Sequence, residues 1–273
     1  MQIPPASPAR PSRCHAVIPS AGSGSRLPGD APKQYRRLLG ESVVQHTVRA
    51  FLQTPRIASV SVVVQEGDVW AADALQPDPR LHLLPRGGAT RAHSVLGGLE
   101  ALLASGADVS DWALVHDAAR CCITPELIDR LIDACLPDDV GGLLALPLPD
   151  TLKAADSAGR VACTEPREGR WLAQTPQMFR IGALREALRA AIEANAPPPP
   201  GRPKAGAAPS GGSERAAGAW GQQFPPTDEA GAMEHQGARP LLVPGASWNF
   251  KITYSPDLEL AQALLAARAG ANP

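Results

Sequence analysis

Short apolar runs alternate with segments of helical period along most of this chain, and this alternation limits its fold more than any other feature. Runs short enough for single strands lie at 15–19, 59–64, 81–85, 111–117 and 141–148. Helices are predicted from Ser42 as N-cap, over 91–104, 125–135 and 182–194, and after Ser255-Pro256. Such alternation is typical of βαβ units. The sequence therefore predicts an α/β fold: a Rossmann-like open, mostly parallel sheet with helices on both faces.

A loop of small residues follows the first apolar run, within the segment AVIPSAGSGSRLPGDAPKQY at 16–35. Gly22 and Gly24 lie in this loop, and the cations Arg26 and Lys33 come after them. Backbone N–H groups of such a loop, with nearby cations, can hold nucleotide phosphates. The third glycine of a dinucleotide motif is missing, and so is the GxxxxGK[ST] pattern of P-loop ATPases. A plain strand-to-helix turn is the alternative, and the paired cations favour a triphosphate.

The motif HDAAR at 116–120 places a carboxylate at the end of a predicted buried strand. Ligands of open α/β sheets bind at the carboxyl ends of strands. Beside a phosphate site, Asp117 is a natural Mg²⁺ ligand. The alternatives are an N-cap or a salt bridge to Arg120. Strand alternation turns His116 to the opposite face, so we interpret it as a core residue.

The segment PRGGATRAHSV contains a second glycine loop between a predicted strand and a predicted helix. Gly87 and Gly88 permit a close approach of backbone to a ligand. Arg91 and Ser94 follow, one helical turn apart. This segment is either a loop that reads a nucleotide base or an ordinary strand-to-helix turn.

Three further cations were considered for ligand binding. Arg167 and Arg170 follow a predicted hairpin, where two arginines are usually a solvated face. Lys251 lies in an otherwise apolar strand predicted at 249–253. A lysine in such a strand must either extend to solvent or face a charged ligand, and we favour the ligand.

The chain is predicted to be one domain over 14–270 with three appendages. Residues 1–13 form a Pro-rich, disordered lead, and 196–226 form a disordered Pro/Gly-rich insert. A hairpin arm at about 149–170 turns at Ser157-Ala158-Gly159. An isolated two-stranded arm is marginal in water, so we expect it to lie on a partner and to form a homodimer.

Composition excludes several other classes of protein. The net charge of −1 gives no basic excess for nucleic acid. No secretory h-region opens the chain and no apolar run is long enough for a membrane helix. The five cysteines are scattered without metal-ligand spacing, which is typical of reduced thiols in the cytoplasm.

Together, these motifs resemble the 2-C-methyl-D-erythritol 4-phosphate cytidylyltransferases of the non-mevalonate isoprenoid pathway. The matching motifs occur in the family's order and cover all but the lead and the insert. They are AGxGxR with PKQY (21–35), GGxxRxxSV (87–95), HDAAR (116–120), PDTLK (149–153), Arg167, QTPQ (174–177), TDEA (227–230) and FKIT (250–253).

The resemblance implies an enzyme of the nucleotide-diphospho-sugar transferase type that moves CMP from CTP to a sugar phosphate. Arg26 and Lys33 match the residues that stabilise the transition state on the triphosphate. Arg167 and Lys251 match the pair that positions the sugar phosphate, and the family's arginine reaches the neighbouring subunit's site. Asp117 matches the metal-facing aspartate, which implies Mg²⁺.

The resemblance also implies the remaining ligand contacts. The nucleotide pocket would be formed by Ser20, Ala21, Gly22, Gly24, Gly87, Gly88 and Ser94. Substrate-lining positions would be Arg120, Asp150, Thr151, Thr175 and Thr227. Two alternatives stay open: a pentitol (ribitol) 5-phosphate cytidylyltransferase, which shares the nucleotide half, and a nucleotide-binding protein without catalysis.

Overall fold

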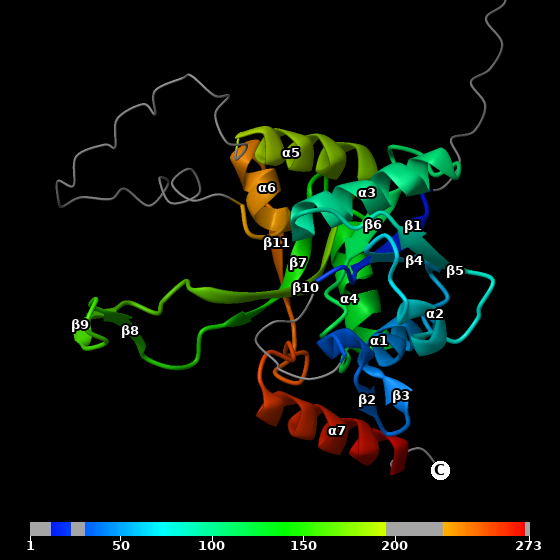
Figure 1. Cartoon of the computed structure of the whole chain (residues 1–273). Helices are drawn as coiled ribbons and strands as arrows, with labels where there is room; N and C mark the ends of the chain where they lie inside the picture. The colour runs from blue at the N-terminus through cyan, green and yellow to red at the C-terminus, as the bar shows by residue number, and fades with distance from the viewer. Residues whose placement is uncertain (1–11, 23–30, 195–225, 271–273) are drawn as a thin grey trace, which may run out of the picture.

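The computed structural model describes residues 12–22, 31–194 and 226–270 of the chain. Most of the predicted lead (1–13) and insert (196–226) lies outside these ranges. The strands, labelled in Figure 1, are β1 (Cys14–Pro19), β2 (Arg37–Leu38), β3 (Glu41–Ser42), β4 (Ile57–Val64), β5 (Leu81–Pro85), β6 (Trp112–Val115), β7 (Gly141–Pro147), β8 (Leu152–Ala155), β9 (Val161–Glu165), β10 (Trp171–Arg180) and β11 (Leu241–Pro244). The helices are the 3-10 turn η1 (Lys33–Tyr35), α1 (Val43–Leu52), α2 (Ala71–Ala74), α3 (Arg91–Ala104), α4 (Pro125–Cys135), α5 (Ile181–Ala194), α6 (Glu229–His235) and α7 (Ser255–Gly270).

The central sheet has seven strands in the order β11-β7-β10-β6-β1-β4-β5. β1 pairs in parallel with both β4 and β6, β4 pairs in parallel with β5, and β7 with β11. Only β10 is antiparallel to its neighbours in this sheet, β6 and β7. The predicted open, mostly parallel sheet is therefore confirmed.

Helices cover both faces of the sheet, as the alternation predicts (Figure 1). On one face α3, α5 and α6 close a core in which Leu99 and Leu184 are fully buried together with Val17 of β1. On the other face α1 and α4 close a second core that includes Phe51 and Ile128. Burying side chains of this size stabilises the fold by about 1.5–3 kcal/mol each. The sheet is thus buried on both sides, and ligands can approach it at the ends of its strands.

Local signals place the helix starts close to where the sequence predicts them. Ser42 caps α1, because its hydroxyl accepts a hydrogen bond from the backbone N–H of Gln45 at 3.0 Å. Pro125 occupies the first turn of α4, where its missing N–H costs no hydrogen bond. α3 and α4 have the predicted bounds 91–104 and 125–135, and α7 begins at Ser255 itself.

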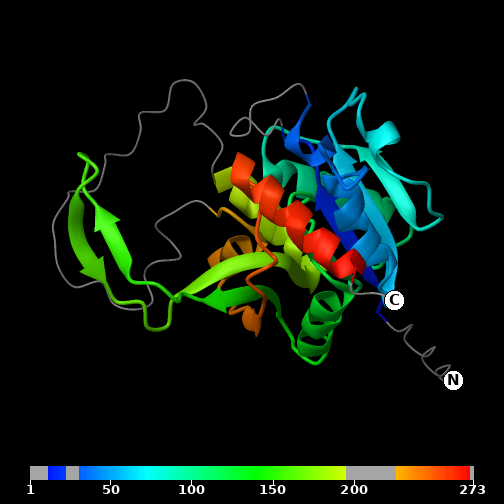
Figure 2. The same ribbon diagram turned by 90° about the horizontal axis from the view of Figure 1, so that it is seen from below.

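The predicted hairpin is present as a separate two-stranded sheet, β8 with β9. β7 and β10 lead out to it, and both views show the hairpin well away from the helices and the central sheet (Figures 1 and 2). Nearly all of its residues are exposed, Val161 among them at 65%. No helix or sheet of the described residues covers the hairpin.

The long strand β10 was not predicted. The sequence places Arg167 and Arg170 after the predicted hairpin and predicts no strand at 171–180. Pro176 lacks the N–H that a central strand normally donates. The structure accommodates Pro176 by shifting the pairing register with β7 between Ala173 and Gln177. The neighbouring strand is also shorter than predicted: β6 ends at Val115, so Asp117 lies in the loop that follows it.

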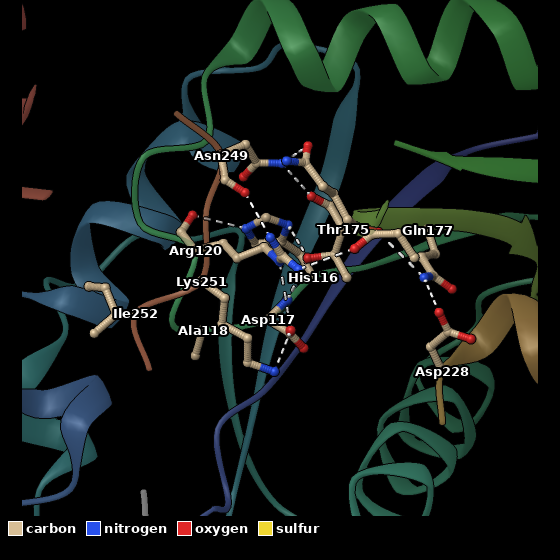
Figure 3. Close-up of polar contacts among 12 residues, drawn as sticks. His116, Asp117, Ala118, Arg120, Thr175, Gln177, Asp228, Asn249, Lys251 and Ile252 are labelled. Atoms are coloured by element: carbon tan, nitrogen blue, oxygen red, sulfur yellow. Dashed lines mark hydrogen bonds and ion pairs between the residues drawn. The ribbon is translucent and has the colours of Figure 1, made fainter. Parts of the chain in front are cut away.

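The predicted strand at 249–253 is wrong, because this segment is a loop. Its polar groups bond to the loop after β6 and to β10 without forming a strand ladder. The backbone N–H of Ile252 donates to the carbonyl of Ala119 at 2.9 Å, and the side chain of Asn249 donates to the carbonyl of Thr175 at 2.8 Å. This loop lies against the end of β6 and carries Lys251 there (Figure 3).

Candidate active site

A cavity of about 550 Å³ opens where the parallel strands β1, β4 and β6 end. Its walls come from the loops that follow these strands, from η1, from the start of α3 and from Lys251. The carboxyl edge of an open α/β sheet is the usual place for a ligand in such folds. Segments far apart in the sequence therefore meet at one site.

Asp117 stands at the centre of the polar groups in this cavity. Its Oδ1 accepts a hydrogen bond from Nε of Arg91 at 2.9 Å, and its Oδ2 lies 2.8 Å from Nζ of Lys251. Nε of Arg120 lies 3.8 Å from the same Oδ2. Burial alone would raise the pKa of this carboxyl, but the surrounding cations outweigh burial and hold its pKa below the usual range. Asp117 is therefore an ionised carboxylate. Arg91 binds one of its oxygens, and Lys251 and Arg120 lie beside the other.

Arg91 joins Asp117 to a second carboxylate. Its Nη1 and Nη2 donate to Oε1 and Oε2 of Glu229 at 2.6 and 3.0 Å, a bidentate pair. Glu229 opens α6 and is fully buried. Burial lowers the pKa of Arg91, but Glu229 and then Asp117 outweigh it, so that its pKa is raised. Burial raises the pKa of Glu229, against the opposing pull of Arg91.

His116 and Thr175 support Asp117 from the side away from the cavity (Figure 3). The backbone N–H of Asp117 donates to Oγ1 of Thr175 at 3.1 Å, and this hydroxyl lies 3.0 Å from Nδ1 of His116. Nε2 of His116 lies 3.2 Å from the carbonyl of Arg120. Because a carbonyl only accepts, the imidazole proton is on Nε2 and the Thr175 hydroxyl donates to Nδ1. The predicted core position of His116 is confirmed, and burial lowers its pKa to about 3.

The segment PKQY fastens the loop after β1 to the 249–253 loop. The side-chain amide of Gln34 donates to the carbonyls of Ser20 and Gly22 at 2.8 and 2.9 Å. Nζ of Lys33 donates to the carbonyl of Ile252 at 2.9 Å. Lys33 and Lys251 thereby reach the cavity from sequence positions more than two hundred residues apart.

The second glycine loop, which contains Gly87 and Gly88, forms another wall of the cavity. The backbone N–H of Gly88 donates to Oγ of Ser94 at 3.1 Å, and the Ser94 hydroxyl donates to the carbonyl of Thr90 at 3.2 Å. A Cβ added to Gly87 would come within 2.5 Å of Cβ of Ala21. Position 87 therefore requires glycine, because any larger residue would collide with the side chain of Ala21 in the first glycine loop.

Most of the residues singled out from the sequence meet at this cavity. Its lining includes Ser20, Ala21, Gly22, Lys33, Gly88, Ser94, Asp117 and Lys251. Gly87 packs against Ala21 of the lining, and Arg120 and Thr175 contact Asp117. Gly24 and Arg26 lie outside the described residues.

The other predicted residues lie elsewhere in this chain. Asp150, Thr151 and Arg167 are exposed near the foot of the hairpin, where the Arg167 guanidinium donates to the carbonyl of Pro149. Arg167 lines a separate surface hollow with Leu148 and Trp171. Thr227 is exposed just before α6. The single chain therefore does not bring Arg167 to the cavity.

The sequence interpretation missed the partner of Arg91. Arg91 was considered only as part of a base-reading loop, and Glu229 was not singled out although it lies in the motif TDEA. Gln34 was likewise read only as part of PKQY. An acidic residue buried at the start of a short helix is a signal of a charged partner, but the sequence does not say which cation supplies it.

Two features are absent from the described residues. Among them, no cluster of three or more His, Cys, Asp or Glu side chains could hold a metal ion. No helix within the same ranges has the length and apolar character needed to cross a bilayer.

The sequence is similar to 2-C-methyl-D-erythritol 4-phosphate cytidylyltransferases. The family model described as "IspD: 2-C-methyl-D-erythritol 4-phosphate cytidylyltransferase" matches residues 14–197 and 214–267. The 2-C-methyl-D-erythritol 4-phosphate cytidylyltransferase of Laribacter hongkongensis is 48% identical over 255 residues, which cover 93% of this chain and 96% of that protein. A bifunctional enzyme IspD/IspF of Albidiferax ferrireducens is 49% identical over 260 residues, 95% of this chain but only 54% of that protein.

Solved structures agree with the sequence matches. A crystal structure of 4-diphosphocytidyl-2C-methyl-D-erythritol synthase superimposes with a TM-score of 0.73 at 34% identity, covering 93% of this chain and 99% of that one. A cytidylyltransferase (IspD) from Francisella tularensis gives a TM-score of 0.71 at 28% identity over 93% of this chain and 100% of that one. Sequence motifs, fold and cavity thus lead to one assignment: this chain belongs to the 2-C-methyl-D-erythritol 4-phosphate cytidylyltransferase (IspD) family.

Proposed function

We propose that this chain is a nucleotidyltransferase that transfers CMP from CTP to 2-C-methyl-D-erythritol 4-phosphate, giving 4-diphosphocytidyl-2-C-methyl-D-erythritol and pyrophosphate. The observation that carries the proposal is the convergence of Lys33, Asp117 and Lys251 on one cavity walled by two glycine loops. Membership of the family supports the identity of the two substrates.

The reaction needs charge neutralisation more than proton transfer. An oxygen of the sugar phosphate attacks the α-phosphorus of CTP, a new P–O bond forms, and the bond to the β-phosphate oxygen breaks to release pyrophosphate. The attacking phosphate is already an anion near neutral pH, so no strong general base is required. The main task is to hold two polyanions in line while charge builds on the α-phosphate. Lys33, with Arg26, would stabilise that charge.

Asp117, the one carboxylate that lines the cavity among the described residues, fits a magnesium ion bound together with substrate phosphates. Mg²⁺ is usually bound through one or two carboxylates together with substrate phosphates, so a cage of several acidic residues is not required. Asp117 is ionised and faces the cavity, and it would be the protein ligand. The ion would supply further neutralisation of the triphosphate.

The remaining site residues are proposed to divide between the two substrates. Ser20, Ala21, Gly22, Gly24, Gly87, Gly88 and Ser94 would bind the nucleotide, largely through backbone groups. Arg120, Asp150, Thr151, Thr175 and Thr227 would lie along the sugar-phosphate side. Lys251 and Arg167 would position the attacking phosphate, with Arg167 contributed by a second copy of the chain.

The exposed hairpin supports a homodimer in which the arm of each subunit lies on its partner. On this proposal residues 14–270 form one domain, with the arm at about 149–170 as its dimerisation element. The cytoplasm is the proposed compartment, because the free cysteines of the described chain fit a reducing environment.

A substrate competition tests the proposal. Purified protein with Mg²⁺ and CTP should release pyrophosphate with 2-C-methyl-D-erythritol 4-phosphate and release far less with ribitol 5-phosphate. A clear preference for ribitol 5-phosphate would move the assignment to the pentitol-phosphate enzymes.

The same assay separates an enzyme from a nucleotide-binding protein without catalysis. Lys33→Ala should lower pyrophosphate release by at least tenfold, a loss of about 1.4 kcal/mol or more in transition-state stabilisation. Absence of release by the unaltered protein with either acceptor would end the catalytic proposal.

A further inference from the structure

We propose that Arg91 and Glu229 are positioning residues that hold Asp117 in the orientation its role requires, an inference that rests on the proposed function. The two oxygens of Asp117 have different surroundings. Oδ1 is held by Arg91 at 2.9 Å, while Oδ2 faces Lys251. The carboxylate therefore has one anchored oxygen and one oxygen for a cation in the cavity.

Glu229 fixes the direction in which Arg91 donates. A guanidinium is a planar fork, so its two Nη groups and its Nε cannot be aimed independently. With Nη1 and Nη2 bound to Glu229 at 2.6 and 3.0 Å, the Nε–H can point only along the remaining edge, toward Asp117. The position of Glu229 therefore fixes, through the rigid guanidinium of Arg91, the direction of the hydrogen bond to Asp117.

Glu229 itself cannot act on a substrate in this conformation. It is fully buried and is not part of the cavity lining, whereas Arg91 is part of it. An effect of changing Glu229 on the reaction must therefore be indirect, either through Arg91 or through the anchoring of α6. Partners that orient a metal-binding carboxylate typically affect affinity or activity by about 10- to 100-fold when they are removed.

α6, which carries Glu229, is anchored to the sheet by a second contact that does not touch Asp117. The Gln177 side chain accepts from the backbone N–H of Ala230 at 2.7 Å and donates to Asp228 at 2.9 Å. Gln177→Met should loosen α6 while leaving the Arg91 fork intact, and it is the matched control. If anchoring of α6 alone mattered, this variant would behave like a change at Glu229.

The first variant is Glu229→Gln, which keeps the shape of the side chain but offers Arg91 one acceptor oxygen in place of two. We expect kcat to fall about tenfold while KM for CTP changes less than threefold. Mn²⁺ binding to the CTP-bound enzyme, followed by electron paramagnetic resonance without the second substrate, should weaken in parallel. Gln177→Met should have a lower melting temperature with kcat within about twofold of the unaltered enzyme.

A double variant separates positioning from stability. Replacing one partner of a buried ion pair is strongly destabilising, whereas replacing both by apolar residues is often neutral. Arg91→Met/Glu229→Met should therefore melt at a higher temperature than either single change and still show the low kcat and weak Mn²⁺ binding.

Three results would overturn the inference: a kcat for Glu229→Gln within twofold of the unaltered enzyme, recovery of kcat in the double variant, or a fall in kcat for Gln177→Met as large as that for Glu229→Gln. Should the double variant not fold, the Glu229→Gln result decides alone. Loss of the proposed function is distinguishable, because an unaltered protein without transferase activity would still report the positioning of Asp117 through Mn²⁺ binding.

Discussion

His116 sets how the stability of the folded site responds to acid. Its imidazole is buried and neutral, and its pKa is lowered to about 3, whereas an unfolded histidine has a pKa of about 6.5. Between these values the unfolded chain binds a proton that the folded chain does not, so stability falls as the pH falls. The lowered pKa of Asp117 acts in the same direction, but only below the ordinary pKa of an aspartate, about 3.9.

The first prediction follows from this difference. Between pH 7.5 and pH 5.5 the unaltered protein should lose about 1.4 kcal/mol more unfolding free energy than His116→Gln, in which no proton is bound at this position. Urea denaturation at the two pH values measures both losses, and groups common to the two proteins cancel. Gln can still donate to the carbonyl of Arg120, so the variant should remain folded. Equal losses in both proteins would show that His116 is protonated in the folded state.

Several single residues that the sequence singles out lie together at one cavity of the structure. Lys33 and Asp117 stand out because a cation after a glycine loop and a carboxylate at a strand end suit phosphates and a metal ion. Lys251 stands out as a lysine in an otherwise apolar run. The pairing among them could not be predicted. Lys251 bonds to Asp117, and Arg91 divides its guanidinium between Asp117 and Glu229, because loops that are distant in sequence fold onto one strand end. No local sequence pattern predicts these contacts between distant segments.

At the scale of elements, the start of α1 depends on one hydroxyl with two partners. Oγ of Ser42 accepts from the N–H of Gln45 at 3.0 Å and donates to the carbonyl of Ala74 at 2.6 Å. Ser42 is buried, so water cannot easily replace these contacts. The cap therefore joins the first turn of α1 to the end of α2.

The second prediction is that Ser42→Ala lowers the free energy of unfolding by about 1–2 kcal/mol. Thr124→Ala is the matched control, because Thr124 occupies the N-cap of α4 without making a side-chain cap bond. The free energy of unfolding should fall by less than about 0.5 kcal/mol in Thr124→Ala. Urea unfolding of the two variants at neutral pH gives both values. A Thr124→Ala loss as large as that of Ser42→Ala would mean that cap contacts do not determine the difference.

Elements with local signals were predicted, and elements fixed by tertiary contacts were not. Helices α3 and α4 carry an N-cap threonine and an apolar face, and their predicted bounds are those of the structure. β10 was missed because Pro176 argues against a central strand, and only pairing with β6 and β7 makes one there. The segment 249–253 gave the opposite error, since no strand of the described residues pairs with it to form a ladder.

At the scale of the whole molecule, one described chain separates residues that the proposed reaction needs together. Lys33 and Lys251 line the cavity, but Arg167 lines a different hollow beside the exposed hairpin. A symmetric dimer could reunite them, because a two-fold axis that places one arm on the partner places the other arm in the same way. Sequence spacing alone cannot distinguish a residue that acts in its own subunit from one that acts in the next.

The third prediction tests this arrangement with two inactive variants. Lys33→Ala and Arg167→Ala homodimers should each show little transfer of CMP, and their equimolar mixture should recover activity after subunit exchange. Random exchange makes half of the dimers mixed, and each mixed dimer has one site with both residues intact, so about a quarter of the unaltered rate should return. A mixture before exchange, or of one variant with itself, is the control. If Arg167 acted in its own subunit, no mixed dimer would contain an intact site, and the rate of the mixture would stay at that of the variants.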